Sequence, residues 1–80
     1  MAMKELSMKE LLVNALISKY EAAIAEHTAN IAVMLEQGVG VAEHPGIVET
    51  LDLEMAKLAE AEDKLSTTKQ FSAPIPPKVV

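Results

Sequence analysis

The sequence has no cysteine, no tryptophan and no arginine, and its aromatic side chains are one tyrosine and one phenylalanine. Without cysteine, disulfides and cysteine-ligated zinc sites are excluded. Any core must consist of aliphatic side chains and methionine, and 80 residues provide for one domain at most. Because Ala, Leu, Val, Ile and Met supply most of the apolar half of the composition, we expect an all-α protein.

Basic charge is also scarce, since seven lysines stand against 12 acidic residues and give a net charge of −5. The absence of arginine removes bidentate contacts to phosphate and guanine, so we expect no nucleic-acid binding. Asn14, Lys19, Glu21 and Glu26 interrupt the most hydrophobic region. We therefore expect no membrane span, and the first residues show no recognisable secretion signal.

The longest regular pattern runs from Ser7 to Gln37 and predicts a helix over about residues 8–37. Ser7 and Glu10 have the spacing of a capping box, and Gly38 suits the left-handed position after a helix. Apolar residues then recur at steps of four and three, which predicts one seam of a helix pair. The seam residues are Val13, Ile17, Tyr20, Ile24, His27, Ile31 and Met34, widened on one flank by Leu12, Leu16, Ala23 and Val33.

Small residues form a second stripe on another side of this helix, made of Ser18, Ala22, Ala25, Ala29 and Ala32. Small side chains let another helix approach closely, which predicts a second contact in an oligomer or larger assembly. Alanine is also the best helix former, so an exposed helix face explains the same stripe. Both interpretations stay open.

The connection over residues 38–44 is short, which predicts an antiparallel return of the chain. Pro45 suits the first position of a second helix over about residues 45–70. Its predicted seam is Ile47, Leu51, Met55, Leu58 and Leu65, with Ala61 as a weaker member; Glu60 with Lys64 and Glu54 with Lys57 are expected on the solvated side. Residues 1–71 are thus predicted to form an antiparallel two-helix hairpin, which self-associates into a bundle or docks on a larger protein.

Residues 72–80 contain three of the four prolines and predict an extended tail. We expect this tail to dock on a neighbour by strand addition or in a groove. The residues expected to dock are Phe71, Pro74, Ile75, Pro76, Pro77, Val79 and Val80.

Groups with catalytic potential are few. Glu26 and His27 are adjacent, about 100° apart around a helix, and no Glu-x-x-His pair of a di-metal bundle occurs. His27 is therefore expected to be a core or boundary histidine that is hydrogen-bonded across the bundle. No activated nucleophile and no phosphate-binding loop is evident, so we expect neither enzymatic activity nor a cofactor.

The region from Met8 to Phe71 resembles small helical-hairpin proteins of tailed phages that infect marine bacteria, above all in residues 43–49 and 57–65. The resemblance implies a virion or accessory protein that acts through contacts, and no functional residue carries over from it. We expect a non-enzymatic structural or assembly protein, located in the virion or the cytoplasm, with protein partners. A cellular adaptor that binds one partner and a metal-binding half of a helical bundle are the alternatives.

Overall fold

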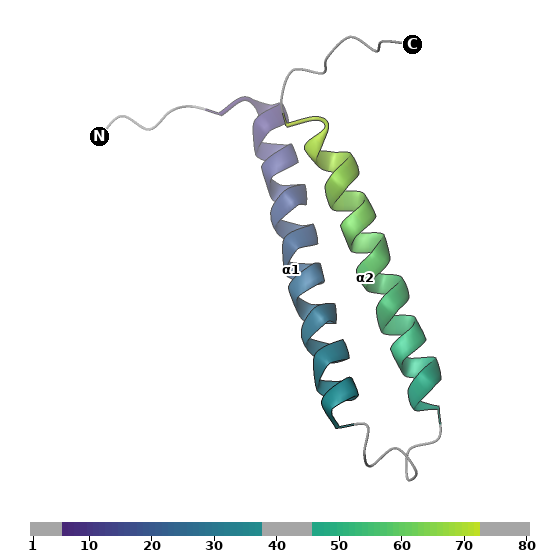
Figure 1. Cartoon of the computed structure of the whole chain (residues 1–80). Helices are drawn as coiled ribbons and strands as arrows, with labels where there is room; N and C mark the ends of the chain where they lie inside the picture. Colours follow the sequence, from purple (N-terminus) through teal and green to yellow (C-terminus); the bar gives the residue numbers. More distant parts are fainter. Residues whose placement is uncertain (1–5, 38–45, 73–80) are drawn as a thin grey trace, which may run out of the picture.

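The computed structural model describes residues 6–37 and 46–72, and within these ranges the chain forms two α-helices and no strand. Helix α1 spans Met8–Glu36 and helix α2 spans Ile47–Lys69. Figure 1 shows that the helices lie side by side and run in opposite directions. The protein is an all-α helical hairpin, which confirms the predicted fold class.

Helix α1 begins at the predicted capping box. Ser7 Oγ accepts a hydrogen bond from the Glu10 backbone N–H at 3.1 Å, and the Ser7 backbone N–H donates to Glu10 Oε1 at 3.1 Å. The helix ends where the Gln37 N–H donates to the Val33 carbonyl at 2.9 Å. The reciprocal cap satisfies two backbone N–H groups at the start of the helix. Gly38, the residue expected to cap the other end, lies outside the described residues.

Helix α2 begins two residues later than the sequence suggested. Gly46 is the N-cap and has φ +91°, a left-handed conformation that side-chain-bearing residues rarely adopt. Thr50 supports this start, because its N–H and its Oγ1–H both donate to the Gly46 carbonyl, at 2.9 and 3.1 Å. The first helical residue is therefore Ile47 and not Pro45 as predicted, because the left-handed Gly46 occupies the N-cap position. Pro45 itself lies outside the described residues.

After Lys69, at the other end of α2, the backbone continues in tighter turns whose hydrogen bonds span three residues. The N–H groups of Gln70, Phe71 and Ser72 each donate to the carbonyl three residues earlier, at 2.9–3.2 Å. Ser72 Oγ also donates to the Lys69 carbonyl at 2.7 Å. These bonds satisfy carbonyls that a helix end leaves without partners. They also carry the chain back toward the first turn of α1, where both helix ends meet (Figure 1).

The two helices meet along a seam of seven positions on each, and these positions alternate steps of four and three. On α1 these are the seven residues predicted from the sequence. On α2 the half-buried or buried positions are Ile47, Leu51, Glu54, Leu58, Ala61, Leu65 and Thr68. Of the described residues, only Ile31 (7% exposed) and Ala61 (5% exposed) are fully buried.

The structure corrects the prediction for Met55. The sequence pattern predicts Met55 in the seam, but its side chain is 46% exposed, and Glu54 occupies the seam position instead. The expectation that Glu54 pairs with Lys57 on the solvated side is wrong for the same reason. A one-residue shift turns a helical side chain by about 100°, which is enough to move Met55 onto the flank.

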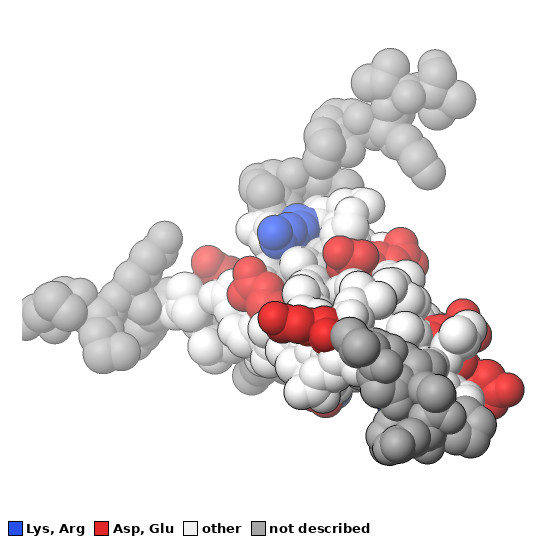
Figure 2. All heavy atoms as spheres, turned by 60° about the horizontal axis from the view of Figure 1, so that its bottom comes forward, with Lys and Arg blue, Asp and Glu red and all other residues white. Residues whose placement is uncertain are grey.

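The rest of the surface is rich in apolar side chains. Large hydrophobic residues that stay exposed are Leu6, Met8, Leu11, Leu12, Leu16, Val33, Leu35, Val48, Leu53, Met55 and Phe71. Neither α1 nor α2 is long and apolar enough to cross a membrane. On the face drawn in Figure 2, acidic side chains lie at several separate places, whereas basic side chains gather at one.

Replacement of Ile31 by alanine tests this packing. Because Ile31 is the one large side chain that is fully buried among the described residues, Ile31→Ala is expected to lower the free energy of unfolding by about 3 kcal/mol. Leu35→Ala on the same helix removes an exposed side chain and should cost less than about 0.5 kcal/mol. Urea denaturation followed by circular dichroism measures both. Equal losses in the two variants would contradict the assigned seam.

Candidate functional site

The most site-like feature of the hairpin is a polar layer inside the seam. Glu54 of α2 accepts two hydrogen bonds at one oxygen, from His27 Nδ1 at 3.0 Å and from Asn30 Nδ2 at 2.8 Å. His27 and Asn30 are three residues apart on α1, so they project from one side of the helix. The His27 and Glu54 side chains are 13% and 14% exposed. An ionised carboxylate only accepts hydrogen bonds, so the contact requires a proton on Nδ1 of His27.

The layer changes the acid–base behaviour of Glu54. The hydrogen bond with His27 lowers the pKa of the Glu54 carboxyl from its ordinary value, and the Asn30 amide lowers it further. Charges on His27 and Lys57 act in the same direction, while burial opposes them. The ionised form is therefore the one that the fold stabilises. Lys57, predicted as the ion-pair partner of Glu54, contributes here only as a nearby charge.

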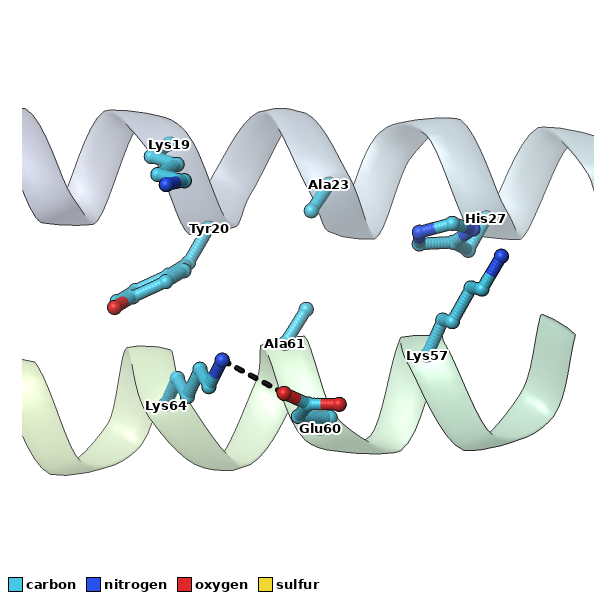
Figure 3. A pocket seen from close by; sticks show the side chains of 8 residues that line it. All are labelled: Lys19, Tyr20, Ala23, His27, Lys57, Glu60, Ala61 and Lys64. Atoms are coloured by element: carbon cyan, nitrogen blue, oxygen red, sulfur yellow. Dashed lines mark ion pairs between the residues drawn. The ribbon is translucent and has the colours of Figure 1, made fainter. Parts of the chain in front are cut away.

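Beside this layer an open groove of about 190 Å³ runs between the helices. Figure 3 shows the side chains that line it, four from each helix. Alanines on both helices make the groove, because their small side chains leave space between the backbones. The lining residues are Lys19, Tyr20, Ala23, His27, Lys57, Glu60, Ala61 and Lys64.

One ion pair crosses the surface of the groove. Lys64 Nζ lies 2.7 Å from Glu60 Oε1, one turn away on α2, and 5.9 Å from the centre of the Tyr20 ring. This is the pair that the sequence predicted on the solvated side. The hydrogen bond between them raises the pKa of Lys64 and lowers the pKa of Glu60. Both side chains are at least half exposed, so solvent weakens the pair and its role is to neutralise charge locally.

This arrangement links the two helices through hydrogen bonds. Within residues 6–37 and 46–72, no three His, Cys, Asp or Glu side chains come together as a metal site. Likewise, every buried side-chain nitrogen or oxygen of the described part has a hydrogen-bond partner. The site is thus a satisfied polar layer next to a shallow groove. Its chemistry is hydrogen bonding and charge, both of which align helices.

The other predicted contact residues are placed as follows. All five members of the small-residue stripe, Ser18, Ala22, Ala25, Ala29 and Ala32, are exposed and face away from α2. Phe71 is half exposed and lines a hollow of about 320 Å³ with Ser72 and the first turns of α1. The remaining tail residues, Pro74, Ile75, Pro76, Pro77, Val79 and Val80, lie outside the described residues, as does the predicted turn at 38–44.

Comparison of the chain with protein-family models, with curated proteins and with solved structures gives no significant match in any of the three.

The polar layer makes stability depend on pH. Because the pKa of Glu54 is lowered in the folded state, its contribution is fully present above the ordinary carboxyl pKa and is lost as pH falls through the lowered value. Glu54→Gln is therefore expected to have a lower melting temperature than the wild type near neutral pH, and the difference should close as the pH falls below the lowered pKa of Glu54.

Thermal unfolding of both proteins by circular dichroism across this pH range is the measurement. Glu62→Gln, on the exposed side of α2, is the matched control and should follow the wild type at every pH. A Glu54→Gln difference that stays constant with pH would contradict the assigned role of the carboxylate.

Proposed function

We propose that this protein is a non-enzymatic structural or assembly protein that acts through helix–helix contacts. The observation that carries the proposal is the imbalance between buried and exposed apolar surface. The seam fully buries Ile31 and Ala61, whereas eleven large hydrophobic side chains of the described part stay exposed. A protein of this size whose own core is so small gains its stability by covering the remaining apolar surface with another chain.

The distribution of these exposed side chains supports an assembly role. Leu12 and Val33 lie on the outer side of α1, Leu16 lies next to the seam, and Val48, Leu53 and Met55 lie along α2; all of them are exposed. Leu6, Leu11 and Phe71 add to them near the open end of the hairpin. Apolar surface on both helices suits a bundle, in which each helix has more than one neighbour.

The resemblance to hairpin proteins of tailed phages suggests a particular setting. A virion is built from many copies of a few proteins, and a small hairpin with spare apolar faces fits a minor component that joins larger subunits. We propose this setting on the resemblance in residues 43–49 and 57–65 together with the exposed faces. The docked C-terminal tail belongs to the same proposal.

Self-association is the first test. Size-exclusion chromatography with light scattering should give a mass of at least two chains at micromolar concentration, and the melting temperature should rise with protein concentration because association stabilises only the folded state. A stable folded monomer with a concentration-independent melting temperature would contradict self-association. That outcome would favour an adaptor that needs a different partner.

A further inference from the structure

The outer side of α1 carries a second regular pattern, distinct from the seam with α2. Leu12, Lys19, Glu26 and Val33 follow one another at intervals of seven residues. Seven residues are close to two helical turns, so the four side chains share one side of the helix, roughly 130° from the seam. All four are exposed, with Leu12 at 58% and Val33 at 51%. Nothing in the described part of the chain covers them.

Two copies of this pattern complement each other when they run in opposite directions. An apolar residue stands at each end, and Lys19 and Glu26 stand between them with opposite charges. The midpoint between Leu12 and Val33 is also the midpoint between Lys19 and Glu26, and it lies between Ala22 and Ala23. A two-fold axis at this midpoint would therefore set Lys19 of one copy against Glu26 of the other, twice. It would also set Leu12 of each copy against Val33 of the other.

The charged pair lacks partners within the hairpin. Neither Lys19 nor Glu26 forms an ion pair with another residue of the described ranges, although Lys19 also lines the groove. The two are about 10 Å apart along the helix axis, too far to reach each other. Between them Ala22 and the half-buried Ala23 lie nearest this side, and Ala15 and Ala29 follow one heptad from Ala22 in each direction. These small side chains allow close approach of a second helix at the axis.

We propose that this face of α1, defined by Leu12, Lys19, Glu26 and Val33, binds the same face of α1 in a second copy of the chain, antiparallel. The complementary charge order is what selects a second copy as the occupant. On α2 a two-fold axis between Lys57 and Lys64 would instead set like charges against each other. The contact deepens the proposed assembly function and rests on it. The result is a four-helix dimer in which the α1 helices form the centre.

Charge reversal tests the pairing. Lys19→Glu sets two carboxylates against each other at both symmetry-related positions, and should raise the dimer dissociation constant about tenfold or more at low salt. Glu26→Lys should do the same. The double variant Lys19→Glu with Glu26→Lys restores opposite charges with the signs exchanged, and should return the dissociation constant to within about threefold of the wild type. Sedimentation equilibrium gives all four constants.

A matched control carries a charge reversal elsewhere on α1. Glu21→Lys is exposed and lies on another side of the helix, so it should leave the dissociation constant within about threefold of the wild type. Circular dichroism of every variant, recorded at a concentration at which that variant is associated, checks that the helices remain intact. If the single reversals act no more strongly than the control, or if the double variant fails to restore association, the proposed contact is overturned.

A second experiment uses the absence of cysteine. Ala22→Cys places one thiol from each copy beside the two-fold axis, where mild oxidation should form a covalent dimer. Thr28→Cys, exposed on the other side of α1, should cross-link at least tenfold more slowly. Equal rates would overturn the contact. A wild-type monomer would overturn both the contact and the proposed function. An oligomer whose dissociation constant is unchanged by the charge reversals, and which cross-links equally at both cysteine positions, would overturn the contact alone.

Discussion

Two packed helices can cover only one side of each other, and the rest of this structure depends on that constraint. The seam has seven positions on each helix, yet only Ile31 and Ala61 are fully buried, because within residues 6–37 and 46–72 no third element closes over its edges. Apolar residues next to the seam, such as Leu16 and Met55, are left in contact with water. The hairpin therefore defines the direction of two helices and leaves apolar side chains of both exposed.

The polar layer of His27, Asn30 and Glu54 gives this thin seam a fixed register. Glu54 is satisfied only when both donors of α1 stand opposite, and a shift of α2 by one heptad would carry the carboxylate away from both. A half-buried carboxylate without donors is costly, so the layer disfavours other alignments more than it adds stability to the observed one. The same register sets the positions of the exposed faces, which makes the layer a condition for any specific assembly.

Much of the fold follows from local signals in the sequence. The Ser7–Glu10 capping box and the steps of four and three along α1 predict the first helix and all seven of its seam positions. On α2 the sequence predicts the seam position at the apolar Met55, because a carboxylate such as that of Glu54 is expected to face water. The structure places Glu54 in the seam instead. The signal that could have placed Glu54 in the seam is His27, since a histidine in a seam needs a hydrogen-bond partner on the facing helix. Gly46 was missed because proline at 45 is a strong helix-start signal, whereas the left-handed turn after it depends on the backbone.

We propose that the folded hairpin depends on association. The most direct test of this dependence is the helical signal in far-ultraviolet circular dichroism, followed on serial dilution together with the mass from light scattering. The helical signal should fall in step with the mass, since chains that lose their partner also lose the cover of their apolar faces. A chain that keeps its full helical signal and unfolds cooperatively as a monomer would contradict the account.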